Sequence, residues 1–297
     1  MKKAFIQLHI AVFLAGFTAV LGKLILLNEG LLVWYRLLLT VMILGGVMLY
    51  KNQIKSIAWK DALKIAGVGL IISIHWVTFY GSVKYANISV ALVCLSASGF
   101  FTAILEPIIM RTEIVVAEIL LGFLAIIGIY IIFDFHPEYK VGIIFGIICS
   151  LGSAIFPIFN RKLVRTFSPK LLTLYELGGG LLLLTFLLPF YFKQFPPIYY
   201  MPSSSDWAWL FVLAFFCTII SFDLQLKSLQ KISAFTANLT YNLEPVYGII
   251  LAFIFFNEKK ALHTQFYLGL TFIMLAIILQ MTRVLLKSRK LQKQNIG

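Results

Sequence analysis

The sequence has few charged residues and no polar stretch long enough to form a soluble domain. Charged side chains make up 12% of the 297 residues, apolar side chains make up 61%, and the mean hydropathy is +0.95. No globular domain in water is this apolar along its whole length. A membrane sensor or scaffold would normally carry an appended soluble domain, so the composition also disfavours that class.

Acidic residues and cysteines are scarce as well. The chain has only four aspartates, and none lies within a few residues of another: Asp61, Asp134, Asp206 and Asp223. A membrane-bound prenyl or acyl transferase needs clustered acids for a divalent metal, or a His/Asp pair at a membrane face. The three cysteines all lie inside apolar stretches, where they are expected to pack rather than to form disulfides or bind metal. An integral membrane enzyme is therefore the weaker alternative.

What the chain does contain is a series of ten apolar stretches of membrane-spanning length. We predict an all-α integral membrane protein with ten transmembrane helices at 4–27, 31–50, 60–83, 88–110, 113–133, 142–164, 170–192, 206–229, 233–256 and 263–286. Short loops imply that neighbouring helices are antiparallel. The first stretch follows two lysines and is interpreted as an uncleaved signal anchor.

The basic residues are unevenly distributed between the two sides of the predicted membrane. The net charge is +13, and 18 of the 25 lysines and arginines fall on the side of the N-terminus, 6 fall on the other side, and Arg36 lies within a span. This bias predicts that both termini are cytoplasmic. The basic C-terminal tail is expected to continue the last helix toward anionic lipid headgroups, so the positive charge indicates a lipid bilayer rather than nucleic acid as its partner.

The same five-span unit occurs twice in the chain. Residues 84–133 align without a gap on 231–280, and Tyr35 aligns on Tyr175 in a second ungapped match. Because five is an odd number, the second copy must be inverted relative to the first. Inverted repeats are typical of secondary transporters. We predict two inverted five-helix repeats, at 1–140 and at 141–297, the second including the cytoplasmic tail.

The ninth span carries the most suggestive set of polar residues. At 100° per residue, Asn238, Tyr241, Asn242 and Pro245 share one face of a helix, with Glu244 beside them near the bilayer midplane. Pro245 frees a backbone carbonyl one turn back. A polar stripe at a broken helix suits a substrate site, and Glu244 is a candidate proton-coupling group. The alternative is hydrogen bonding between packed helices, with Glu244 neutral or paired.

The third span places an imidazole among aromatic side chains. His75, Trp76 and Tyr80 could line a cavity, and His75 could take up protons near neutral pH. The alternative is a neutral His75 bonded to a backbone carbonyl or hydroxyl, with packed aromatics around it.

Spans two and seven carry a related pair of motifs. Tyr35-Arg36 lies near the outer face and Tyr175-Glu176 near the inner face. A gate or entrance role is one interpretation, and snorkelling or a local partner is the other. Opposite leaflets make a direct pair between Arg36 and Glu176 unexpected.

Other polar features indicate local structure. Asp223 and Lys227 have the i,i+4 spacing of a helix pair, and Glu106 is expected to pair with Arg111 nearby. The run of glycines at 178–180 is expected to permit close helix packing.

The ten spans, the duplication and one set of spaced motifs together resemble the EamA-type members of the drug/metabolite transporter superfamily. The motifs are Ser233-Ala234, Leu243-Glu244-Pro245, Asn257-Glu258 and Gly269. The first half departs from this pattern, because Ser98 stands where Pro245 does and Arg111 where Glu258 does. The two halves are therefore expected to bend differently.

The resemblance implies a multi-pass carrier of the bacterial inner membrane, most often an exporter of amino acids or related solutes, with no bound cofactor and no ATP-driven step. It implies a central cavity lined by spans one, three, four, six, eight and nine. Helix membership and polarity then suggest these lining residues: Phe17, His75, Trp76, Tyr80, Ser96, Ser98, Asn160, Asn238, Tyr241, Asn242 and Glu244. Few fixed charges line this cavity, which suits a zwitterionic or moderately polar solute. Proton coupling and facilitated diffusion both stay open.

Overall fold

The computed structural model describes residues 2–111, 113–135, 137–229, 240–241, 243–256 and 264–294. Within these ranges every regular element is helical, and the bounds are α1 Lys2–Leu24, α2 Glu29–Tyr50, α3 Trp59–Tyr85, α4 Ile88–Leu95, α5 Ser98–Met110, α6 Val116–Phe135, η1 Pro137–Tyr139, α7 Lys140–Leu163, α8 Pro169–Gln194, α9 Ser204–Ala214, η2 Phe215–Ile220, α10 Ser221–Leu229, α12 Glu244–Phe256 and α13 Thr264–Gln294. The predicted all-helical class is confirmed.

Seven helical segments are long and apolar enough to cross a membrane: Lys3–Leu24, Glu29–Tyr50, Trp59–Tyr85, Ile88–Met110, Lys140–Leu163, Pro169–Gln194 and Ser204–Gln225. The other three predicted spans correspond to shorter apolar helices at Val116–Ile131, Glu244–Phe256 and Tyr267–Ala276. The number of ten crossings stays a prediction.

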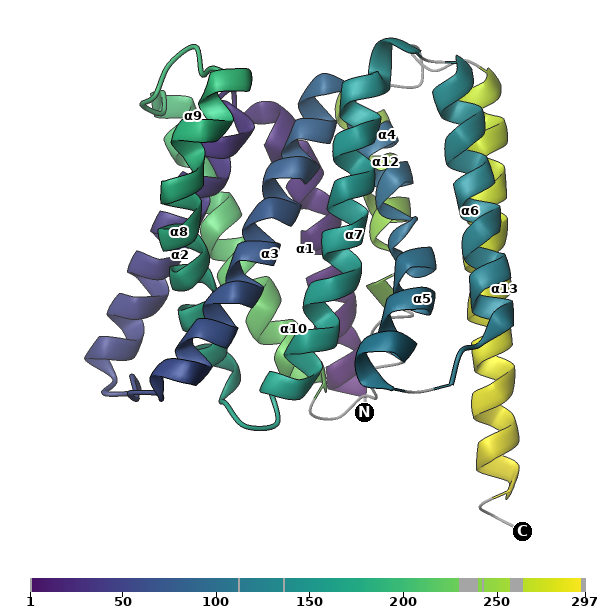
Figure 1. Ribbon diagram of the computed structural model, residues 1–297, viewed down its shortest axis with the longest axis horizontal. Coiled ribbons are helices and arrows are strands. Elements are labelled where there is room, and N and C mark those ends of the chain that lie inside the picture. The colour runs from purple at the N-terminus through teal and green to yellow at the C-terminus, as the bar shows by residue number, and fades with distance from the viewer. Residues whose placement is uncertain are drawn as a thin grey trace.

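The long helices run roughly parallel to one another as a bundle, and successive helices alternate in direction (Figure 1). The start of α1 and the end of α13 lie at the same end of the bundle, and α6 packs along α13 at one edge. With 31 residues, α13 is roughly 46 Å long at 1.5 Å per residue. The expected continuation of the last helix into the basic tail is confirmed.

Both halves contain a helix break at equivalent positions. Helix α4 ends at Leu95, and a turn at Ser96 and Ala97 precedes α5. The repeat alignment places this turn on Leu243 and Glu244, where a turn at Leu243 precedes α12. The first half breaks there without a proline, so the two halves are more alike at this position than the sequence predicted.

Local hydrogen bonds stabilise the break in the first half. The backbone N–H groups of Ser96 and Ala97 donate to the carbonyls of Val93 and Cys94 at 3.1 and 3.0 Å, and the Ser96 hydroxyl donates to Leu92 at 3.2 Å. These tighter i→i+3 bonds satisfy backbone groups that would otherwise be unpaired inside the membrane.

Glycines let α3 approach α8 closely. A Cβ at Gly69 would collide with the backbone of Glu176, and a Cβ at Gly179 would lie 2.6 Å from Ala66. A Cβ at Gly180 would lie 2.6 Å from the Gly69 carbonyl oxygen, whereas Gly178 faces open space. The predicted close packing is therefore confirmed for two of the three consecutive glycines.

One predicted charge pair is wrong and one is confirmed. Lys227 pairs with Asp223 as expected. Glu106 pairs instead with Arg161 of α7, at 2.6 Å. Arg111 adopts a left-handed conformation (φ 55°) just beyond the end of α5, so it does not continue the helix face that carries Glu106.

We expect Gly69→Ala to lower the free energy of unfolding by about 1–3 kcal/mol, because the added methyl group overpacks the α3–α8 contact. Gly67→Ala, on the same helix, is the matched control, because nothing lies within 4 Å of the place that its added methyl group would occupy. Thermal or denaturant unfolding of both variants in detergent micelles measures the difference. Equal stabilities would contradict the close-packing interpretation.

Candidate substrate site

Arg36 points into the bundle rather than toward the membrane surface. It lies in the second turn of α2, and only 3% of its surface is exposed. Its guanidinium group lies over the indole of Trp76 from α3, with the central carbon 3.6 Å from the ring centroid. Desolvated cation–π contacts of this kind stabilise a buried positive charge. The snorkelling alternative therefore does not apply to Arg36.

Two hydroxyl groups hold the guanidinium in place. Nε donates to Thr218 Oγ1 and Nη1 donates to the Tyr80 hydroxyl, each at 2.9 Å. Nη2 has no hydrogen-bond partner among the described residues. Arg36, a residue of the predicted gate, therefore contacts Trp76 and Tyr80, which were predicted to line the cavity. We call this group the Arg36 cluster: Arg36, Trp76, Tyr80 and Thr218.

Thr218 was not predicted as a site residue. It lies in η2, a π-helical turn between α9 and α10, where its own hydroxyl donates to the Leu213 carbonyl at 2.9 Å. π-Turns inside longer helices are frequent at functional sites because they re-aim side chains. The one sequence signal is a single hydroxyl residue within the apolar run Phe215–Ile220.

Glu244 is an acidic residue close enough to interact electrostatically with Arg36. It begins α12, and Gly16 of α1 packs against its backbone, where a Cβ would lie 3.1 Å from the Glu244 carbonyl oxygen. Its carboxyl group interacts electrostatically with Arg36, although no salt bridge joins the two among the described residues. Tyr241 lies one turn before it and packs against α1. Asn238 and Asn242 lie outside the described residues.

His75 faces α7 rather than the guanidinium. Its Nδ1 lies 2.8 Å from the Cys149 carbonyl oxygen, and its ring lies 5.7 Å from the ring of Phe156. This is the hydrogen-bonded arrangement that the sequence left as the alternative to a titrating role. The proposed proton role of His75 stays a prediction.

Asn160 and Glu176 form a second polar pair. The Asn160 amide donates to Glu176 Oε2 at 3.4 Å across α7 and α8. Glu176 is 1% exposed, and its Oε1 and the Asn160 Oδ1 are buried without a hydrogen-bond partner among the described residues. Glu176 thus has a local partner, and no contact joins it to Arg36 in the described part of the chain.

The remaining predicted residues lie apart from the guanidinium. Phe17 of α1 stacks against Phe13 and meets Phe255 edge-on, with centroid separations of 6.5 and 6.3 Å. Ser96 forms the turn between α4 and α5, and Ser98 begins α5. Both serines therefore mark the helix break rather than contacts with Arg36.

Tyr35 and Tyr175 make matching contacts at opposite ends of the bundle. The Tyr35 hydroxyl donates to the Tyr200 carbonyl, and the Tyr175 hydroxyl donates to the Lys55 carbonyl, each at 3.1 Å. Tyr35 thereby bonds the loop before α9, and Tyr175 bonds the loop before α3. These two loops occupy equivalent positions in the two repeats. The contacts agree with an inverted duplication.

The end of the bundle opposite the termini is joined by hydrogen bonds between the two halves. Asp206 of α9 accepts from the backbone N–H of Leu26 at 2.8 Å, and the Asn28 amide donates to Phe195 at 3.1 Å. Glu29 accepts from the Tyr191 hydroxyl at 2.5 Å. These bonds hold the loop between α1 and α2 against the second half.

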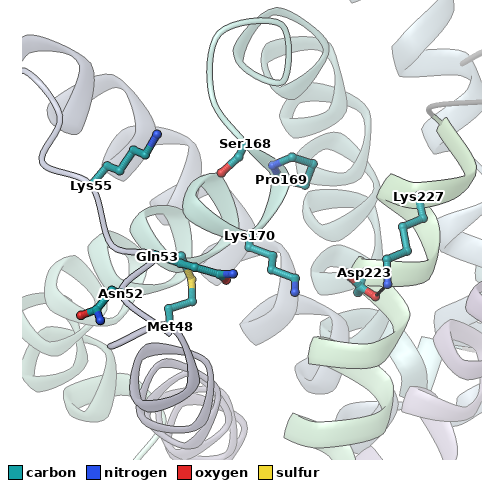
Figure 2. Close-up of a pocket in the computed structure, with 9 residues that line it drawn as sticks. All are labelled: Met48, Asn52, Gln53, Lys55, Ser168, Pro169, Lys170, Asp223 and Lys227. Atoms are coloured by element: carbon teal, nitrogen blue, oxygen red, sulfur yellow. Dashed lines mark hydrogen bonds and ion pairs between the residues drawn. The ribbon is translucent and has the colours of Figure 1, made fainter. Parts of the chain in front are cut away.

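The end that holds the termini instead contains a pocket of about 460 Å³ (Figure 2). It lies between the end of α2, the start of α8 and α10, and its lining residues are Met48, Asn52, Gln53, Lys55, Ser168, Pro169, Lys170, Asp223 and Lys227. We call it the basic pocket. Its volume is within the range of small-molecule sites.

Comparison with known proteins identifies the family. The model of the EamA-like transporter family matches residues 2–134 and, separately, residues 140–282. The chain belongs to the EamA-like transporter family. The two matches agree with the predicted halves, while the boundary at 140–141 stays a prediction.

Two relatives of this EamA-family chain are named as transporters. An uncharacterized transporter of Archaeoglobus fulgidus is 24% identical over 185 residues, which are 62% of this chain and 64% of the relative. A second uncharacterized transporter of that organism is 28% identical over 122 residues, or 40% of this chain and 44% of the relative. The chain thus matches less than two thirds of the length of either.

A solved crystal structure shares the fold of the EamA-family chain. The two chains superpose with a TM-score of 0.62 at 14% identity, over 93% of this chain and 96% of the other. Family, relatives and apolar helices together identify a multi-pass membrane protein of a transporter family. In the part of the chain that the structure describes, no group of three or more His, Cys, Asp or Glu side chains could hold a metal ion.

We expect Tyr80→Phe to destabilise this EamA-family protein by about 1.5–3 kcal/mol, the range for a hydrogen bond to a charged group. The change removes the acceptor of Arg36 Nη1 and leaves a buried charged donor unpaired. Tyr130→Phe is the matched control, because Tyr130 is largely exposed on α6. Unfolding in micelles would measure both, and a Tyr80→Phe variant as stable as the control would show that the Arg36–Tyr80 bond contributes little.

Proposed function

We propose that this EamA-family protein is a secondary transporter that moves small metabolites, exporting amino acids or related solutes, across a bacterial inner membrane. The observation that carries this proposal is the Arg36 cluster, a buried charge at the meeting point of α2, α3 and η2. Ionisable groups at such depth are costly and commonly mark substrate or ion pathways.

Alternating access is the proposed mechanism. Helix breaks at equivalent positions of both halves support it, because discontinuous helices build the midplane sites of many inverted-repeat transporters. The ends of the bundle also differ. Hydrogen bonds join the halves at the end opposite the termini, and the other end, where the Tyr175–Lys55 and Arg161–Glu106 contacts also join the halves, contains the pocket. We propose that Tyr35 and Tyr175 act as tethers of the gate loops at these two ends.

The proposed topology has ten spans with both termini in the cytoplasm, as the distribution of lysine and arginine favours. The basic pocket then faces the cytoplasm. The proposed cavity lies between 1–140 and 141–297. The lining residues that the sequence predicted stay part of this proposal, with Arg36 and Thr218 added to them.

Uptake into proteoliposomes tests the function directly. We expect radiolabelled amino acids to exchange across the vesicle membrane, because a carrier with a central site catalyses exchange without an energy source. The panel should also include sugars, and uptake should be measured with and without a pH gradient. Empty vesicles are the control, and failure to move any solute under any gradient would overturn the proposal.

Proton coupling through Glu244 is a separate prediction. Groups that interact electrostatically with Glu244 are Arg36 from α2, Cys149 from α7 and Tyr241 beside it. We expect Glu244→Gln to retain exchange but to lose the dependence of net transport on a pH gradient, since the amide cannot titrate. Glu106→Gln, which alters a half-buried ion pair with Arg161, is the control. Unchanged pH dependence in Glu244→Gln would remove Glu244 from the mechanism.

A further inference from the structure

The guanidinium of Arg36 has unused hydrogen-bonding capacity. A guanidinium group has five N–H donors, and two recorded acceptors, Thr218 and Tyr80, take one each. Both acceptors are neutral, and no carboxylate within the described residues forms a salt bridge with Arg36. A buried charge in this state is expensive unless another acceptor completes its coordination.

The geometry limits where that acceptor can lie. Trp76 covers one face of the guanidinium at 3.6 Å, while Nε and Nη1 are occupied along its edge. The remaining edge, at Nη2, is open to an acceptor in the plane of the group. A carboxylate oxygen can accept from Nη2 there, because a hydrogen bond between a guanidinium and a carboxylate is stronger than one to a neutral acceptor.

A stripe of buried side chains on α2 leads from Arg36 toward the basic pocket. Thr40, Leu44 and Met48 follow Arg36 at intervals of four residues, and all are buried. Met48 lines the pocket, so the stripe extends over twelve residues, or roughly 18 Å. Thr40 Oγ1 is buried without a hydrogen-bond partner among the described residues. It provides a second unused polar group one turn from Arg36.

An apolar cluster separates the pocket from this polar region. Leu44 and Met48 of α2 pack with Leu171 of α8, and Tyr175 covers them from the side. These side chains would have to move before a solute in the pocket could reach Thr40 and Arg36.

The pocket carries excess positive charge. Asp223 is paired with Lys227, which leaves Lys55 and Lys170 without an ion-pair partner among the described residues. The Lys170 side chain extends from α8 toward the middle of the pocket, between α2 and α10 (Figure 2). A concave site lined by charges of one sign concentrates ions of the opposite sign.

We propose that Arg36 binds the carboxylate of the transported solute through Nη2, and that the basic pocket is the mouth through which this acid group reaches Arg36. The inference rests on the proposed transport function and narrows it to solutes that carry an acid group. Arg36 then determines specificity, and Lys55 and Lys170 raise the local concentration of the solute.

Acid and amide forms of one solute provide the test. The full chain, purified in detergent, is melted in the presence of each standard L-amino acid and of its carboxamide, for example L-leucine and L-leucinamide. For each acid that binds, we expect the corresponding amide to bind with an apparent affinity about tenfold lower or more. This is the change expected when a hydrogen bond to a charged group is lost. This comparison needs no variant. Equal affinities of acid and amide, or no binding of any acid, would overturn the inference.

Substitution of Arg36 then assigns the effect to this residue. Arg36→Lys keeps the charge but loses the planar fork, and Arg36→Gln loses both. We expect Arg36→Gln to bring the affinities for acid and amide together and Arg36→Lys to reduce the difference between them, which a purely structural role would not do. Thr218→Ser, which keeps the Nε acceptor, should retain the discrimination. If Arg36→Gln retains it in full, Arg36 is not the acid-binding group.

The pocket is tested by the salt dependence of uptake. We expect Lys170→Gln and Lys55→Gln to slow uptake of an acidic solute at low ionic strength and to approach the wild-type rate at high salt, where attraction is screened. Lys60→Gln, an exposed lysine at the same end but outside the pocket, is the control. Equal rates in all three variants would overturn the role of the pocket.

Uptake also separates this inference from the proposed function. Transport confined to sugars or other neutral solutes would overturn acid recognition and leave the transporter intact. Absence of all transport would overturn the proposed function itself.

Discussion

The burial of one positive charge is the constraint on which the centre of the structure depends. A guanidinium group in the apolar interior must be covered and hydrogen-bonded, because neither lipid nor packed side chains replace its hydration. Arg36 meets this requirement with an indole from α3, a phenol from the same helix and a hydroxyl from η2. These contacts join α2 to α3 in the first half and to the α9–α10 helix in the second. The charge therefore links the two halves, and the cluster is where we propose that a solute binds.

Backbone requirements explain the irregular helices around that cluster. An unpaired peptide group inside a membrane is costly, so helices can break only where turns, side chains or neighbouring helices satisfy the freed groups. The turn at Ser96 and Ala97 uses tighter hydrogen bonds, and the π-turn of η2 uses the Thr218 hydroxyl. Close glycine contacts between α3 and α8 hold the surrounding bundle together without larger side chains. The irregular segments thus lie within a closely packed frame of helices.

The sequence predicted the membrane helices better than it predicted the residues of the candidate site. Apolar runs and the repeat predicted the membrane helices, and Pro245 predicted a break in the second half. The break at Ser96 was not foreseen, because no residue there prohibits a helix and the turn depends on the packing around it. Hydropathy placed Arg36 within a span, but not the direction of its side chain, which depends on the position of Trp76 in space. Thr218 was missed because a π-turn leaves no periodic signal. The sequence singled out His75 and Glu176, yet only the structure identifies the Cys149 carbonyl and Asn160 as their partners.

The matching tyrosines at the two ends have unequal surroundings. Tyr35 is buried and meets Trp207 edge-on, with centroids 5.4 Å apart, whereas the equivalent Tyr175 is partly exposed. Rupture of the Tyr35 bond would therefore expose aromatic surface to water, and rupture of the Tyr175 bond would expose less. Equivalent tyrosines of the two repeats thus bury unequal amounts of aromatic surface. Under the proposed alternating-access mechanism, we expect the population without solute to favour the state that opens on the side of the basic pocket.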